Sequence, residues 1–337
     1  MTTVNRRITL AFRPVGFPKV SDFHLDYAPL PSLAAGEVLV RSVYLSLDPH
    51  LRGRMDDAPS EAAPVGLGEV MTGRGVGFVL ASENARFRPG EAVEGILGWQ
   101  EYAALEGREL RKIDPALAPI STALGVLGRP GLAAYFGLLD IGQPHRGETV
   151  VVSEAAGAIG MLVGQIAKLK GCRVVGIASS DAKISWLLDE LGFDATVNDR
   201  TEEHFELRLR DLCPDGIDVY FDNVGGAASD AVMGRINPKA RIAVCGQASQ
   251  DNLERPENGP RWLGRLIVRQ AKVEGFRVSA FAERFPEGLE QLAAWLHDGK
   301  IRYREDVAQG IESAPQAFVG MLRGKSQGKP LVQLSPA

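Results

Sequence analysis

The chain has 337 residues, 45% of them hydrophobic and 24% charged, and a formal net charge of −4 at pH 7. This length predicts two domains with a sizeable core, and the interspersed charges argue against a nucleic-acid surface. No apolar run approaches the ~20 residues that span a bilayer, and residues 1–12 lack the apolar core of a signal peptide. Three cysteines, far apart in sequence, fit reduced thiols, so we expect a cytoplasmic protein without membrane or nucleic-acid partners.

The first third of the chain is typical of β-structure. Residues 37–47 alternate apolar and polar side chains, and short runs at 75–80 and 91–96 are bounded by Gly and Pro. These patterns predict strands. After residue 299 short strands return, and the final one is expected at 330–334.

Between these regions the pattern changes to strands that alternate with helices. Five runs that we interpret as strands are 150–153, 173–178, 195–198, 218–222 and 241–245. Helical patterns lie between them. This alternation predicts a parallel sheet covered on both faces.

Residues 150–160, Val-Val-Val-Ser-Glu-Ala-Ala-Gly-Ala-Ile-Gly, hold the most informative motif. Ala155, Gly157 and Gly160 stand at the three positions of the dinucleotide fingerprint, with Ala in place of the first Gly. Small residues there let the backbone turn tightly and approach a diphosphate, which then sits on the positive end of the next helix. A glycine-rich turn without a ligand is the alternative.

The residues after the motif complete a strand–turn–helix–strand unit. Ile159, Val163, Ile166 and Leu169 recur at helical spacing, and Gly171 is a candidate C-terminal cap. The strand at 173–178 follows. Residues 179–181 are then expected to cap a helix whose apolar positions are 184, 187, 188 and 191.

The end of this second strand bears on the choice of cofactor. NAD enzymes usually place an acidic residue there, whereas NADP enzymes need room and positive charge. Ser179 and Ser180 are uncharged donors that suit a phosphate, and Lys183 lies in the first helical turn, where an anion would relieve its conflict with the helix dipole. A solvated lysine is the alternative, and Asp181 could instead hold a 2′-hydroxyl. We expect NADPH.

The residues that bind zinc in related architectures are not evident. The cysteines all lie in the central region, and His24 and His50 lack partners at ligand spacing. We therefore expect no metal site. Without a Lewis acid, hydride transfer to a conjugated C=C is easier than alcohol oxidation, because the negative charge spreads onto a carbonyl oxygen that one or two donors can hold.

The simplest architecture joins both ends of the chain into one β-rich domain. We expect a substrate domain from residues 1–123 and 299–337, with a doubly wound Rossmann domain, residues 124–298, inserted between them. The cleft between the domains is the expected active site.

Five segments resemble the zinc-independent medium-chain reductases that include leukotriene B4 dehydrogenase/prostaglandin reductase, plant double-bond reductases and NADPH-dependent curcumin reductase. The segments are 46–55, 131–138, 155–160, 221–226 and 244–246. The resemblance implies a GroES-like β-rich domain, a homodimer, and reduction of the α,β double bond of enones and enals with NADPH.

The resemblance also implies roles for individual residues. The expected cofactor-binding residues are Ala156, Gly157, Ala158, Ile159, Gly160, Ser179, Lys183, Arg200, Asn223, Cys245, Gly246, Phe276, Val278 and Ser326. Tyr135 lies in a segment that borders the nicotinamide. The alternatives are that Asn223 only caps a turn and that Phe276 only fills core.

Three positions depart from the family pattern. His50 and the pair Asp251–Asn252 stand where tyrosines are common, and Asp199, beside Arg200, replaces another. His50 could hold the substrate carbonyl or return a proton near neutral pH. A surface histidine is the alternative.

The segment 251–262 is either a lid, with Trp262 as its apolar anchor or as a substrate wall, or an ordinary connection.

We expect an ene-reductase acting on a conjugated ketone or aldehyde, with His50 and Tyr135 as the catalytic residues. The alternatives are an NADPH:quinone reductase and a non-catalytic NADPH-binding sensor.

Overall fold

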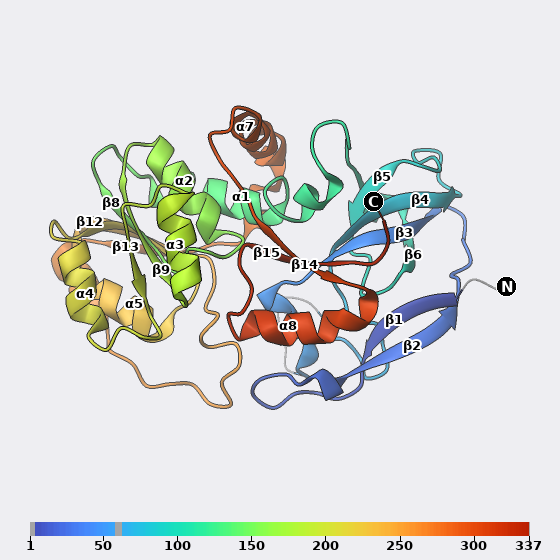
Figure 1. Ribbon diagram of the computed structural model, residues 1–337, viewed down its shortest axis with the longest axis horizontal. Coiled ribbons are helices and arrows are strands. Elements are labelled where there is room, and N and C mark those ends of the chain that lie inside the picture. Colours follow the sequence, from blue (N-terminus) through green and yellow to red (C-terminus); the bar gives the residue numbers. More distant parts are fainter. Residues whose placement is uncertain (1–3, 58–62, 337) are drawn as a thin grey trace. The chain divides into compact units, whose positions relative to one another are not determined.

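The computed structural model describes residues 4–57 and 63–336. It divides into two compact units, the first made of residues 1–125 and 305–337 and the second of residues 126–304. The central unit is thus inserted between two segments that fold together. Figure 1 labels many of the elements in both units.

The first unit is mostly antiparallel β-structure. Its seven-stranded sheet has the order β14-β15-β3-β4-β5-β7, with β6 also paired to β3, and β1 and β2 form a separate antiparallel pair. The strands are β1 (Val4–Leu10), β2 (Phe23–Pro29), β3 (Glu37–Ser46), β4 (Gly75–Ser82), β5 (Ala92–Gly95), β6 (Tyr102–Glu106), β7 (Arg111–Lys112), β14 (Glu305–Gln309) and β15 (Lys329–Gln333).

Helices in this unit are short. The longest is α8 (Ala314–Leu322), and the 3₁₀ segments are Val20–Asp22, Pro49–Leu51, Gly53–Met55, Gly107–Glu109, Ile120–Leu124 and Ile311–Ser313.

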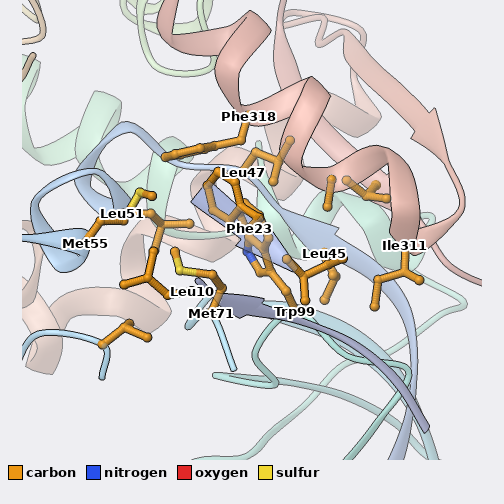
Figure 2. Close-up of a cluster of buried hydrophobic side chains, with 14 of the residues drawn as sticks. Leu10, Phe23, Leu45, Leu47, Leu51, Met55, Met71, Trp99, Ile311 and Phe318 are labelled. Carbon is orange, nitrogen blue, oxygen red and sulfur yellow. The ribbon is translucent and has the colours of Figure 1, made fainter. Parts of the chain in front are cut away.

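A hydrophobic cluster around Trp99 forms one core of the first unit (Figure 2). The rings of Phe23 and Trp99 stack with centroids 5.5 Å apart, and the ring of Phe318 from α8 meets Trp99 edge-on at 5.5 Å. Leu51 and Met55 are buried in the same cluster. Burial of these two side chains fixes the segment that carries His50.

The second unit contains the predicted doubly wound sheet. Its six parallel strands have the order β10-β9-β8-β11-β12-β13. They are β8 (Thr149–Val152), β9 (Arg173–Ala178), β10 (Ala195–Asn198), β11 (Ile217–Asp222), β12 (Ile236–Val244) and β13 (Lys272–Gly275). The residues of β8 are all fully covered, as expected for a central parallel strand.

Helices precede, separate and follow the strands of the second unit (Figure 1). They are α1 (Arg129–Phe136), α2 (Gly160–Leu169), α3 (Asp181–Asp189), α4 (Phe205–Leu212), α5 (Gly226–Met233), α6 (Leu263–Arg269) and α7 (Phe285–His297), with a π-helical turn at Gly137–Gly142 and a 3₁₀ segment at Val278–Arg284. Side chains of α4, α5 and α6 share one apolar cluster with the strands, so these three helices cover the same face.

Differences from the sequence-based expectations have local causes. β12 begins five residues earlier than expected, and its extra part contains Pro238 and Lys239, the latter with φ of 66°. A proline within a run argues against a strand, so the sequence conceals this part of β12. β13 was not predicted, because its four residues, Lys272–Gly275, include only one β-branched side chain. None of the helices that the structure describes is both long and apolar enough to traverse a bilayer.

Candidate functional site

The sheet of the second unit reverses its strand order between β8 and β11. The chain leaves β8 toward β9 on one side and leaves β11 toward β12 on the other. In open parallel sheets, ligands bind outside the carboxyl ends of the strands at such a point. The loops after β8 and β11 therefore form the expected ligand-binding edge of this sheet.

The turn after β8 has the tight backbone that the fingerprint predicts. The N–H of Ala155 donates to the carbonyl of Ile177 at 2.9 Å, and the N–H of Gly157 donates to the carbonyl of Glu154 at 3.0 Å. A Cβ on Gly160 would lie 2.3 Å from the Glu154 carbonyl oxygen, so only glycine fits there. Helix α2 begins at Gly160, and in its first turn the N–H of Met161 donates to the Gly157 carbonyl at 3.1 Å and that of Leu162 to the Ile159 carbonyl at 3.0 Å.

Helix α2 packs tightly against the rest of the second unit. Val163 and Ile166 are fully buried, as the predicted stripe requires, whereas Leu169 is half-exposed at the last turn. A Cβ on Gly164 would lie 1.9 Å from the ring of Phe193. Gly171 has φ of 80°, the left-handed conformation expected just beyond a helix end.

A buried carboxylate organises the strand ends around this turn. Asp222, the last residue of β11, is 4% exposed. Its oxygens accept from the Tyr220 hydroxyl at 2.9 Å, the Ser229 hydroxyl at 2.7 Å and the Ser153 hydroxyl at 3.2 Å. They also accept from the Gln247 amide at 3.2 Å and from two backbone N–H groups of the following loop. Six donors thus satisfy this carboxylate.

Asn223 connects the same strands by a second route. Its side-chain Nδ2 donates to the Ser153 carbonyl at 2.8 Å, and its backbone N–H donates to the Ser153 hydroxyl at 2.8 Å. The N–H groups of Cys245 and Gly246 both donate to the Asp222 carbonyl, at 2.8 and 3.1 Å. The ends of β8, β11 and β12 are therefore joined into one rigid edge.

The acidic surroundings affect two titratable side chains here. Burial, followed by the charge of Asp222, raises the pKa of Tyr220 well above its ordinary value. Burial, followed by the charges of Glu154 and Asp222, raises the pKa of Cys245 to about 12. Cys245 is therefore a protonated thiol at neutral pH and a poor nucleophile.

The end of β9 holds the residues expected to bind a 2′-phosphate. The Ser180 hydroxyl caps α3 by accepting from the Lys183 N–H at 3.4 Å. Lys183 is only 6% exposed, and its Nζ donates to the Ser179 hydroxyl at 3.2 Å. The buried ammonium group of Lys183 thus lies beside the hydroxyl of Ser179, just after the carboxyl end of β9.

The neighbouring acid is engaged elsewhere. Asp181 accepts a hydrogen bond from Asn198 Nδ2 at 2.9 Å, which ties α3 to the end of β10. Arg200 follows β10 with its side chain exposed, and its N–H donates to Asn198 Oδ1 at 3.1 Å. This corner of the unit therefore carries two cations close to the end of the second strand.

Phe276 lies in an aromatic cluster. Its ring meets that of Phe221 edge-on with centroids 6.1 Å apart, and a Cβ on Gly137 would lie 2.3 Å from it. The N–H of Phe276 donates to the Val244 carbonyl at 3.3 Å. Its side chain is half-buried, and its backbone continues from the end of β13. Val278 opens the next 3₁₀ segment.

Tyr135 belongs to α1 and is 9% exposed. Its hydroxyl donates to Glu287 Oε1 at 3.3 Å, and its ring packs edge-on against Phe136 at 5.0 Å. Burial, followed by the charge and hydrogen bond of Glu287, raises the pKa of Tyr135. The phenolic proton is thus committed to a carboxylate of α7 in this structure.

In the first unit, His50 is an exposed side chain on a firmly held segment. The segment is held by an ion pair between Lys329 and Asp48: Lys329 Nζ donates to Asp48 Oδ1 at 2.7 Å and to the Leu47 carbonyl at 2.8 Å. The Ser46 hydroxyl donates to the other Asp48 oxygen at 2.6 Å. Lys329 is 1% exposed.

Ser326 lies partly exposed in the first unit, in the connection between α8 and β15.

The loop 251–262 carries no helix or strand and ends at Trp262, the N-cap of α6. The indole of Trp262 donates to Asp230 at 2.9 Å and packs with the apolar cluster under α5 and α6. Trp262 therefore anchors the end of this loop.

Across residues 4–57 and 63–336, no three His, Cys, Asp or Glu side chains stand close enough to hold a metal ion.

Two family models match the chain. Residues 6–113 match an N-terminal domain of oxidoreductase, and residues 158–295 match a zinc-binding dehydrogenase domain. Together with the doubly wound sheet and its glycine turn, these matches define an oxidoreductase with a nucleotide-binding unit.

Individual relatives match over nearly their full length. The putative NADP-dependent oxidoreductase YfmJ of Bacillus subtilis is 49% identical over 99% of both chains. NADPH-dependent curcumin reductase of Escherichia coli is 42% identical over 98% of this chain and 97% of its own. The structure of CurA from Vibrio vulnificus in complex with NADPH is 47% identical, covers 98% of this chain and 100% of its own, and superposes with a TM-score of 0.94.

The chain therefore belongs to the medium-chain dehydrogenase/reductase family, among the members that include leukotriene B4 dehydrogenase/prostaglandin reductase and curcumin reductase. The family assignment made from the sequence motifs is confirmed.

Two central features were not found from the sequence. The Asp222 network joins residues about 70 positions apart, and the Lys329–Asp48 pair joins residues 281 apart. The Phe-Asp-Asn-Val-Gly-Gly segment was noted as a motif, but the role of its carboxylate depends on which strands become neighbours.

The Lys329–Asp48 pair is expected to contribute to the free energy of unfolding in a way that depends on pH. Burial raises the pKa of Asp48, but the charges of Lys329 and His50 and the hydrogen bonds from Lys329 and Ser46 outweigh it and lower this pKa from 3.8 to about 2. A lowered folded-state pKa stabilises the protein above the unfolded value, by about 2 kcal/mol here, and this stabilisation is lost as the pH falls from about 4 to about 2. Asp48→Asn should cost about 3–5 kcal/mol at pH 7, because it leaves the Lys329 charge buried.

Urea unfolding at pH 7 and pH 3 measures both effects. The difference in unfolding free energy between wild type and Asp48→Asn should be smaller at pH 3 than at pH 7. Asp26→Asn, which breaks the half-exposed pair with Arg7, is the control and should cost no more than about 1 kcal/mol. Equal costs for the two variants, or a gap independent of pH, would refute the assigned role.

Proposed function

We propose that the protein is an NADPH-dependent reductase of the α,β double bond of conjugated ketones and aldehydes. The observation that carries the proposal is the glycine turn at the point where the strand order reverses, with Lys183 buried at the end of the neighbouring strand. The names of the similar proteins, an NADP-dependent oxidoreductase and a curcumin reductase, support the same cofactor and a conjugated carbonyl substrate.

The second unit offers a place for each part of this cofactor. The segment 156–160 and the start of α2 would hold the diphosphate, since small residues and the positive end of a helix suit an anion. Ser179, Lys183 and Arg200 would hold the 2′-phosphate. Asn223, Cys245 and Gly246, with the backbone at Phe276 and Val278, would border the nicotinamide, and Ser326 would add a contact from the first unit. When bound, NADPH supplies the hydride for the β carbon of the substrate.

His50 is the proposed proton donor. A carbonyl oxygen that gains negative charge needs a hydrogen-bond donor, and imidazole can donate a proton near neutral pH. The segment around His50 is fixed by Leu51, Met55 and the Lys329–Asp48 pair, while the imidazole itself is exposed. An exposed ring on a firmly held segment is suited to binding a substrate oxygen.

Tyr135 is the second proposed catalytic residue. Its proton lies in a hydrogen bond to Glu287, so this phenol would have to exchange partners before it could donate to a substrate. We therefore propose His50 as the main donor and Tyr135 as a supporting one.

Assays with simple enones and NADPH test the function and the donor together. Loss of the reduced-nicotinamide absorbance with formation of the saturated ketone is the expected result. His50→Phe should lower kcat by about 10²–10⁴-fold. His24→Phe, which changes another exposed histidine of the first unit, should not.

Turnover of quinones without turnover of enones would instead identify a quinone reductase. Binding of NADPH without consumption by any acceptor would identify a sensor. A His50→Phe variant with full activity would remove His50 from the mechanism.

We expect Lys183 to determine the preference for NADPH over NADH. Lys183→Met should weaken NADPH binding about ten- to a hundredfold, because it removes a charge-assisted hydrogen bond of about 1.5–3 kcal/mol, and it should leave NADH binding unchanged. Calorimetric titration measures both. Lys170→Met, an exposed lysine at the end of α2, is the control. Equal losses for NADPH and NADH would contradict the assignment.

We also propose that the protein is a homodimer in the cytoplasm. The three free cysteines fit a reducing compartment. β13 is an edge strand, and α6 before it exposes Leu263, Ile267 and Val268 by 76 to 79%. An open strand edge beside large exposed apolar side chains is typical of an interface between protein chains.

Light scattering should therefore give twice the chain mass of 36.3 kDa. Val268→Lys should shift the protein to the monomer, whereas Leu188→Lys, on a different helix, should not. A monomeric wild type would refute the dimer.

A further inference from the structure

The turn at the proposed diphosphate site contains an acidic residue, Glu154. Its φ is 48°, in the left-handed region that residues other than glycine rarely adopt. The strand β8 ends two residues before it and Gly157 follows three residues after it. Glu154 thus stands within the tightest part of the fingerprint.

The side chain of Glu154 lies against Gly157. A Cβ built on Gly157 would be 2.9 Å from the carboxylate carbon of Glu154 and 2.9 Å from its Oε1. In the dinucleotide fold, the glycine at this position lets the backbone approach the diphosphate. The carboxylate therefore occupies the side of Gly157 that the fingerprint keeps open.

The charge of Glu154 also acts beyond its own loop. It is one of the two carboxylates whose charge, after burial, holds the pKa of Cys245 high. The other is Asp222, whose oxygens accept hydrogen bonds from six donors. The site thus combines a backbone suited to anions with a carboxylate placed over it.

We propose that Glu154 is a cofactor-site residue that limits the affinity of this turn for the dinucleotide diphosphate. Two like charges compete for the space beside Gly157, so the carboxylate has to move aside when the cofactor binds. The result is weaker binding and faster release of both NADPH and NADP⁺. The inference rests on the proposed function, because it takes this turn as the diphosphate site.

Calorimetric titration of wild type, Glu154→Gln and Glu154→Gly with NADPH and NADP⁺ tests the proposal. Glu154→Gln removes the charge at nearly constant size and should tighten binding of both nucleotides about three- to tenfold at low salt. Glu154→Gly also removes the side chain and suits the left-handed backbone, so it should tighten binding at least as much. Glu290→Gln, an exposed acid of α7 in the same unit, is the matched control and should change nothing.

Adenosine 2′-monophosphate, used as a competitor, separates this effect from a general change of charge. It lacks the diphosphate, so its affinity should be the same in all variants. If Glu154→Gln binds NADPH no more tightly than the wild type does, the proposal is overturned. The carboxylate would then either leave the affinity for the cofactor unchanged or increase it. Tighter binding of the monophosphate as well would overturn it too. Failure of the wild type to bind NADPH would instead overturn the proposed function.

Discussion

The buried carboxylate of Asp222 holds the carboxyl ends of β8, β11 and β12 at fixed positions. A charged group taken out of water is costly unless it is fully hydrogen-bonded. Here hydroxyl, amide and backbone donors from all three strand ends supply that compensation. The same contacts that satisfy the charge therefore define the edge of the sheet where the strand order reverses.

The other features of the second unit follow from this edge. Because Ser153 is held by both Asp222 and Asn223, the chain enters the turn from a fixed position and must bend at once to begin α2. That bend requires glycine at 160 and forces a left-handed conformation on Glu154. Backbone strain of this kind persists where the surrounding structure determines it, and it is common at ligand sites. The strained residue is also the acidic one, which is why we assign it a role in cofactor affinity.

The sequence predicted those parts of the fold that depend on local patterns. The strand at 173–178 and the strand at 195–198 match β9 and β10, because each is a short β-branched run between clear breaks. A cap within residues 179–181 was predicted from residue type alone, and Ser180 supplies it. Parts that depend on distant partners were not predicted. These include the edge strand β13, the early start of β12, and the hydrogen bonds that commit Tyr135 to Glu287 and Asp181 to Asn198.

Hydrogen exchange with and without NADPH tests the central claim that this edge binds the cofactor. The account predicts added protection in peptides that span 153–163, 222–226 and 245–248, because the bound diphosphate and nicotinamide would cover their N–H groups. Little change is predicted in the strands of the first unit. Protection confined to other segments, or none at saturating NADPH, would contradict the account.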